Sequence, residues 1–209
     1  AIHGGWPKSA RISVRYPGKS CTINCQPDPY HMFRQLNGRT YQLSPQSVGL
    51  FPLFIQIFHN NMTEGLREIS FSYEKGIFYV LFLEGDTLHQ IPVGFSTARQ
   101  TWLTIHEEPY LIATSGEFTS DENDIPVLKL TLTFLEECVS RKIQIFFQDE
   151  QIQIRFLETP GKGMIMEGLE SVTEELANKL IFATFRDNGG MTVVHRLMEG
   201  TIEPVVQGT

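Results

Sequence analysis

The sequence predicts a mainly β protein, an antiparallel barrel or a bent β-sandwich with one short C-terminal helix. Three observations predict this class. Apolar and polar residues alternate along most of the 209-residue chain, which is the period of a strand with one buried face. Short polar or glycine-containing turns separate the alternating segments. Strands do not alternate with helices, so a parallel, doubly wound sheet is not expected.

The N-terminal residues predict a hairpin followed by a break. Residues 11–16 alternate in polarity, and residues 21–25 continue the alternation after a Pro-Gly-Lys turn. Pro27 and Pro29 then interrupt the pattern, because proline lacks an N–H donor and has a fixed φ. We therefore assign residues 1–35 to an N-terminal hairpin and linker.

The central residues 36–158 are assigned to an antiparallel β core. Strands are predicted at residues 41–43, 51–58, 69–73, 77–83, 88–93, 101–106, 110–118, 128–134, 143–147 and 152–156. In most of them one face is apolar and the other polar, which is typical of antiparallel sheet. Residues 51–58 are apolar on both faces and predict a strand that is covered on both sides.

The C-terminal residues 159–209 are assigned to a helix-hairpin extension and an extended or frayed tail. Ser171 and Glu174 fit a capping box and predict a helix that reaches Leu180. Two apolar segments within residues 181–197 flank an Asn-Gly-Gly turn, which predicts a hairpin.

The composition limits the possible partners. The chain has 17 basic and 24 acidic residues and a net charge of −7, so a nucleic-acid-binding surface is not expected. It has no apolar run of about 18 residues, so we expect no membrane span. It also lacks a signal-peptide pattern, and the compartment stays open.

Motifs for catalysis or metal binding are weak. Ser72 and Lys75 match the S-x-x-K pattern, but positions i and i+3 of a strand face opposite ways. Cys21 and Cys25 lie about 13 Å apart if they share a strand, too far for a disulfide. The six histidines show no metal-binding spacing. We therefore assign no catalytic residue, no metal ligand and no cofactor.

Aromatic residues supply the candidate binding site. The chain has 15 Phe, 6 Tyr and 2 Trp residues, which either fill the core or line an apolar ligand cavity. Phe95, Trp102 and Tyr110 lie around irregular strand ends, where a cavity mouth or an interface is expected. We take these three residues as candidate ligand-binding residues.

About 120 residues of the chain resemble a known type of domain. The residues that carry the likeness are 37–43 (NGRTYQL), 69–71 (ISF), 89–95 (HQIPVGF) with Trp102, 113–119 (ATSGEFT), 127–134 and 143–156. This stretch resembles the C-terminal β domain attached to some bacterial β-lactamase-like serine hydrolases of the penicillin-binding class. In that family the catalytic residues belong to a preceding domain, so none transfers to this chain.

The resemblance implies a non-catalytic β domain that accompanies a serine hydrolase and packs beside, or regulates, its active site. This hypothesis predicts an exposed apolar patch and no deep cavity. The alternative is a free-standing β-barrel that binds a small apolar ligand, which predicts an enclosed pocket of roughly 300 Å³ or more lined by aromatic residues. A third hypothesis, an enzyme with a dispersed site, predicts titratable groups that converge in a cleft.

Overall fold

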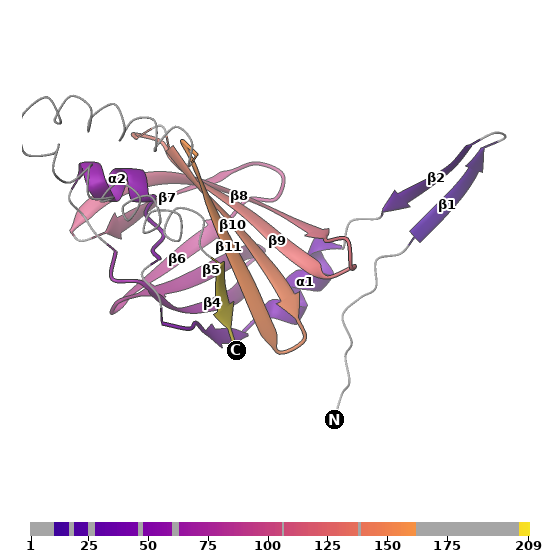
Figure 1. Cartoon of the computed structure of the whole chain (residues 1–209), viewed down its shortest axis with the longest axis horizontal. Helices are drawn as coiled ribbons and strands as arrows, with labels where there is room; N and C mark the ends of the chain where they lie inside the picture. Colours follow the sequence, from indigo (N-terminus) through magenta and orange to yellow (C-terminus); the bar gives the residue numbers. More distant parts are fainter. Residues whose placement is uncertain are drawn as a thin grey trace, which may run out of the picture.

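A computed structural model describes residues 11–16, 19–24, 28–45, 48–59, 63–105, 107–137, 139–161 and 205–209. Most of these residues form two antiparallel sheets (Figure 1). The predicted mainly β, antiparallel class is confirmed. The predicted helix after Ser171 and the predicted hairpin within residues 181–197 lie outside the described residues.

The two sheets have simple strand orders. The four-stranded sheet has the order β3-β4-β5-β6, and the six-stranded sheet has the order β12-β11-β10-β9-β8-β7. The strands are β3 (Thr40–Gln42), β4 (Leu66–Glu74), β5 (Ile77–Glu84), β6 (Thr87–Val93), β7 (Arg99–Ile105), β8 (Glu108–Ser120), β9 (Pro126–Phe134), β10 (Val139–Gln148), β11 (Gln151–Thr159) and β12 (Val205–Gly208). The eight strands from β4 to β11 coincide with the eight predicted between residues 69 and 156, because each one buries alternate residues.

The predicted N-terminal hairpin is also present. Strand β1 (Arg11–Tyr16) pairs antiparallel with β2 (Lys19–Asn24), with Arg11 opposite Asn24. This pair forms a separate two-stranded sheet.

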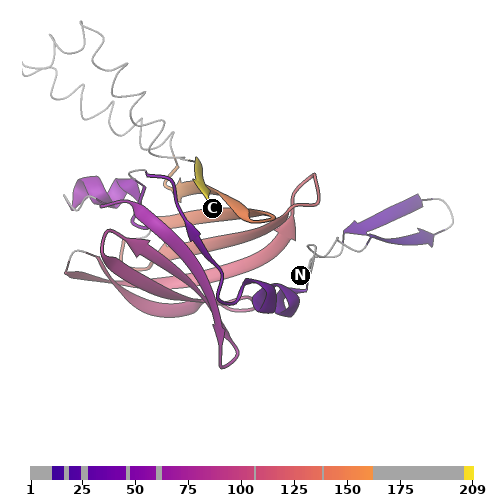
Figure 2. The same ribbon diagram turned by 90° about the horizontal axis from the view of Figure 1, so that it is seen from below.

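The two sheets meet at both pairs of edges around one core (Figure 2). At one edge the Gln42 N–H donates to the Thr209 carbonyl at 2.9 Å, and the Thr209 N–H donates back to Gln42 at 3.0 Å. At the other edge Gly94 forms a parallel bridge with Ser115. The C-terminal residues, expected to be extended or frayed, thus form a strand that links the sheets.

Side chains from both sheets fill the space between them. On β10, Ile143, Ile145 and Phe147 are almost completely buried, as are Ile152 and Ile154 on the adjacent β11. The intervening residues of both strands are more exposed. The strict alternation therefore fixes the register, because a shift of one residue would turn these apolar side chains toward water.

A short helix corrects the predicted strand at residues 51–58. Helix α2 (Leu53–Phe58) occupies most of this segment, and the Gln56 N–H donates to the Pro52 carbonyl at 3.1 Å. A short segment that is apolar on all sides fits a buried strand and a buried helix equally well. At the first residue of this helix the Leu53 N–H donates to Glu158 Oε2, from a distant strand, at 2.8 Å, so a long-range contact satisfies a donor at the helix start.

A second helix begins where the sequence suggested only a break. Helix α1 (Pro29–Leu36) has Asp28 as its N-cap, with the Asp28 carboxylate accepting from the Tyr30 N–H at 3.1 Å. Proline is favoured at the first helical position because its missing N–H needs no partner there. α1 buries Met32 and Phe33 in the core, so these residues, assigned from the sequence to a linker, pack with the β sheets. Figures 1 and 2 place α1 and α2 at opposite ends of the β core.

Candidate functional site

A pocket of about 320 Å³ lies between α1 and the turn that joins β6 to β7. Its lining comes from three parts of the chain: the first half of α1, the start of β5 and the β6–β7 connection. The lining residues are Pro29, Tyr30, Phe33, Gly76, Phe78, Val93, Gly94, Phe95, Ser96, Thr97 and Arg99. The pocket is partly open to solvent, so a small molecule could enter it without unfolding of the core.

Aromatic rings form the apolar wall of this pocket. The ring of Phe33 lies 4.9 Å from that of Phe78 and 4.7 Å from that of Phe95, measured between centroids. Phe95 also stacks on Phe118 at 5.5 Å with an interplanar angle of 5°. Phe33, Phe78 and Phe118 are buried, whereas Phe95 is half-buried. The aromatic core therefore extends to solvent at Phe95.

The β6–β7 turn is held tightly against its neighbours. The Gly94 N–H donates to the Thr114 carbonyl at 3.2 Å, and Gly94 accepts from the Gly116 N–H at 2.9 Å. A Cβ atom at Gly94 would lie 1.8 Å from the Thr97 carbonyl oxygen. Only glycine fits at this point, and the close approach fixes the turn that carries Phe95 into the pocket.

The three candidate residues from the sequence lie in three different environments. Phe95 lines the pocket. Trp102, on β7, is 59% exposed and is not among the lining residues. Tyr110, on β8, is buried, and its hydroxyl donates to Glu108 Oε2 at 2.5 Å.

Sequence reasoning missed Phe33 and Arg99 as lining residues. One signal for Phe33 was available: an Asp-Pro pair before apolar residues at positions 32, 33 and 36 is typical of an amphipathic helix with an N-cap. No local signal distinguished Arg99, because only the fold of the β6–β7 turn brings it to the pocket.

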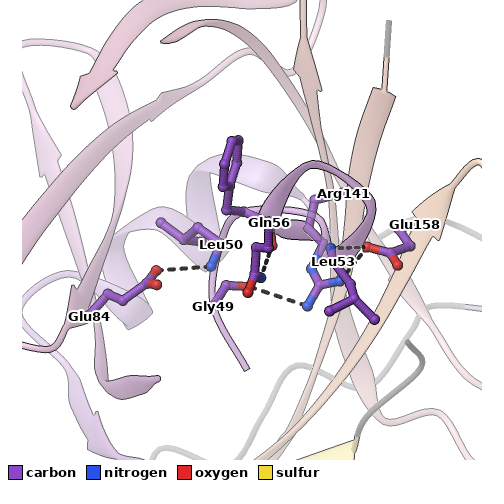
Figure 3. Close-up of polar contacts among 8 residues, drawn as sticks. Gly49, Leu50, Leu53, Gln56, Glu84, Arg141 and Glu158 are labelled. Atoms are coloured by element: carbon purple, nitrogen blue, oxygen red, sulfur yellow. Dashed lines mark hydrogen bonds and ion pairs between the residues drawn. The ribbon is translucent and has the colours of Figure 1, made fainter. Parts of the chain in front are cut away.

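A buried ion pair lies at the α2 end of the core (Figure 3). Arg141 Nη1 donates to Glu158 Oε2 at 3.0 Å, and Arg141 Nη2 donates to the Gly49 carbonyl at 3.2 Å. Burial lowers the pKa of Arg141, while the adjacent carboxylate of Glu158 acts to raise it. Arginine remains charged in proteins, so this cation needs its partner.

Further hydrogen bonds extend this network along the chain that precedes and forms α2. The Leu50 N–H donates to Glu84 Oε2 at 3.0 Å, and Thr63 Oγ1 donates to the other oxygen of that carboxylate. Gln56 Nε2 donates to the Phe51 carbonyl at 2.6 Å. Most of the groups that these side chains contact are main-chain atoms, so the network stabilises the chain that precedes and forms α2.

A histidine lies between two carboxylates near the end of α2. His59 Nε2 is 3.5 Å from Glu137 Oε2, and His59 Nδ1 is 3.8 Å from Glu108 Oε2. Within the described residues, no group of three or more His, Cys, Asp or Glu side chains is arranged to hold a metal ion. The contacts of His59 with these two carboxylates join the end of α2 to β8 and to the segment between β9 and β10.

In the part of the chain that the structure describes, no helix combines the length and the apolar character that a membrane-spanning helix requires.

The comparisons with known proteins provide no family. No family model matches the sequence, and no curated protein matches it. Among solved structures, the chain is similar to the fatty acid-binding protein in brain tissue of Drosophila melanogaster, with 13% sequence identity and a TM-score of 0.38. The match covers 59% of this chain and 91% of that chain. Because this similarity is slight, the function has to be argued from the pocket itself.

Proposed function

We propose that this chain binds a small molecule and that the pocket beside α1 holds the apolar body of that ligand. One observation carries the proposal: a pocket of about 320 Å³ opens where half-buried Phe95 extends the buried aromatic rings of Phe33 and Phe78 to solvent. Ligand pockets in proteins range from about 300 to 1,000 Å³ and are lined mainly by apolar and aromatic groups with a few polar ones. This pocket is partly open, and its accessible lining is more polar than apolar, so the ligand would contact polar groups beside the ring of Phe95.

The size of the pocket sets the expected affinity. A two-ring aromatic molecule that buries about 150 Å² of apolar surface gains roughly 4 kcal/mol from the hydrophobic effect. Stacking on a ring such as Phe95 adds about 0.5–1.5 kcal/mol. These gains together correspond to a dissociation constant of about 0.1 to 0.5 mM. Because association also costs translational and rotational freedom, we expect a simple aromatic probe to bind no more tightly than this.

The test uses N-phenyl-1-naphthylamine, a neutral aromatic fluorophore. Titration into the protein is expected to give a saturable rise in fluorescence with one site per chain. Phe95→Ala removes the ring nearest to solvent and is expected to weaken binding about tenfold. Amide chemical shifts of Gly76 and Gly94 in NMR spectra should move with the same saturation, since both residues line the pocket.

Phe146→Ala is the matched control. Phe146 is also a half-buried phenylalanine, but it lies on β10 under the guanidinium of Arg155, 4.8 Å from its ring centroid. This variant is expected to bind the fluorophore as the wild type does. Absence of saturable binding by the wild type, or equal losses in both variants, would contradict the proposal.

A second candidate function is the one that the family resemblance implies, docking beside the catalytic domain of a serine hydrolase. The observation that favours it is the exposure of Trp102 and Leu88, which are 59% and 55% exposed on β7 and β6, the end strands of the two sheets. Docking surfaces are typically contiguous apolar patches, and a patch that includes these two side chains is what this candidate requires. A non-catalytic accessory domain should show no stoichiometric labelling by a fluorophosphonate probe, and such labelling of the chain alone would overturn this candidate.

A further inference from the structure

The pocket beside α1 carries a cation as well as an aromatic wall. We infer that its ligand is a small aromatic acid whose carboxylate pairs with Arg99. The inference rests on the proposed binding function of this pocket and adds the chemical class of the ligand.

Arg99 is the charged residue among the described residues that line the pocket. It is the first residue of β7 and lies opposite Thr114 in the sheet, so its main chain is fixed while its side chain is exposed. Its guanidinium forms no ion pair or hydrogen bond with another described residue. By contrast, Arg67 pairs with Asp86 at 3.3 Å and Arg141 pairs with Glu158 at 3.0 Å.

An arginine with free donors is suited to a carboxylate. The guanidinium is planar and presents paired N–H groups that match the two oxygens of a carboxylate. The chain has a net charge of −7, so a local cation is needed to favour an anionic ligand over general repulsion. Asp28, at the start of α1, is an acidic residue whose carboxylate already has a partner: it accepts a hydrogen bond from the Tyr30 N–H as the N-cap of the helix.

Polar groups follow the accessible aromatic ring along one stretch of the pocket lining. Half-buried Phe95 precedes the hydroxyl groups of Ser96 and Thr97 in the β6–β7 connection, and Arg99 begins β7. The rings of Phe33 and Phe78, on α1 and β5, are buried. A ligand with a flat apolar body and an acidic group at one end can therefore place its rings against Phe95 and its carboxylate at Arg99.

The experiment compares 2-naphthoic acid with 2-naphthamide, which has nearly the same shape but no charge. Both are titrated by displacement of N-phenyl-1-naphthylamine from the full chain at pH 7. The wild type is expected to bind the acid about fivefold more tightly than the amide, as an exposed charge pair with good geometry allows. Arg99→Gln should abolish this preference without changing the affinity for the amide, and Arg99→Lys should retain part of it.

Arg67→Gln is the matched control, because Arg67 is another exposed arginine in a strand but is not among the lining residues. It should leave the preference for the acid unchanged. Equal binding of acid and amide by the wild type, or a preference that survives Arg99→Gln, overturns the inference and leaves the proposed binding function intact. Failure of the fluorophore and both naphthalene compounds to bind overturns both.

Discussion

Arg141 and Glu158 lie directly opposite each other on β10 and β11, and their side chains form an ion pair that is almost completely excluded from water. Arg141 Nη1 lies 3.0 Å from Glu158 Oε2, and the two side chains are 2% and 1% exposed. The same carboxylate oxygen accepts the Leu53 N–H, and the same guanidinium donates to the Gly49 carbonyl. A single cross-strand pair therefore fixes the segment that leads into α2.

Breaking this pair from either side should destabilise the fold strongly. Glu158→Gln removes the charge but keeps an oxygen for the Leu53 N–H, and Arg141→Met leaves a buried carboxylate without its cation. Each single variant is expected to lose about 3–5 kcal/mol of unfolding free energy, because an uncompensated buried charge is costly. Urea denaturation followed by circular dichroism measures the loss.

The double variant gives the coupling between Arg141 and Glu158. Arg141→Met combined with Glu158→Gln should lose much less than the sum of the two single losses, because it leaves neither charge unpaired. Lys129→Gln, which removes the more exposed pair with Glu117, serves as the control and should change stability little. Single losses that simply add would show that the two charges do not act together.

Gly94→Ala should disturb the β6–β7 turn and with it the proposed ligand site. The new Cβ would lie 1.8 Å from the Thr97 carbonyl oxygen, which belongs to the main chain and cannot rotate away. We expect weaker binding of N-phenyl-1-naphthylamine and a loss of about 1–3 kcal/mol in stability. Gly161→Ala, where the nearest atom is 3.7 Å away, should change neither quantity. Unchanged binding by Gly94→Ala would show that this turn does not shape the site.

Trp102 and Tyr110 should behave differently from Phe95 in ligand binding. Trp102→Ser is expected to leave fluorophore affinity and stability unchanged, because the indole is exposed outside the pocket. Tyr110→Phe loses the hydrogen bond to Glu108 and is expected to cost about 1 kcal/mol of stability without affecting affinity. The same fluorescence titration and urea denaturation check both variants. A tenfold loss of affinity in either variant would indicate that the ligand binds at that residue and not at Phe95.

Adjacent residues of β12 should tolerate a charge very differently. Val206 is 2% exposed and faces the core, whereas Val205 is 54% exposed. Val206→Asp is expected to destabilise the protein by about 3 kcal/mol or more, because it buries a carboxyl group without a partner. Val205→Asp should change the melting temperature little. Equal melting temperatures for the two variants would mean that β12 does not complete the six-stranded sheet.

The sequence by itself determined the mainly β class and the position of most strands. Between residues 69 and 156 most strands have one apolar and one polar face, and the side-chain period of two leaves one possible orientation toward the core. The polar, glycine-containing turn at residues 74–76 was also predicted, and in the structure Lys75 and Gly76 have the positive φ of a tight hairpin. These features depend on neighbouring residues, so they can be recognised locally.

Only the tertiary structure decided which apolar segment became a helix and where a pocket forms. At Leu53, where α2 begins, the N–H group meets the carboxylate of Glu158, 105 positions along the chain. Phe33 and Phe95 come together because α1 packs beside the β6–β7 turn, and this contact also brings Arg99 to the rim. Such partners are distant in sequence, and the free energy that selects them comes from burial and hydrogen bonds formed only in the complete fold.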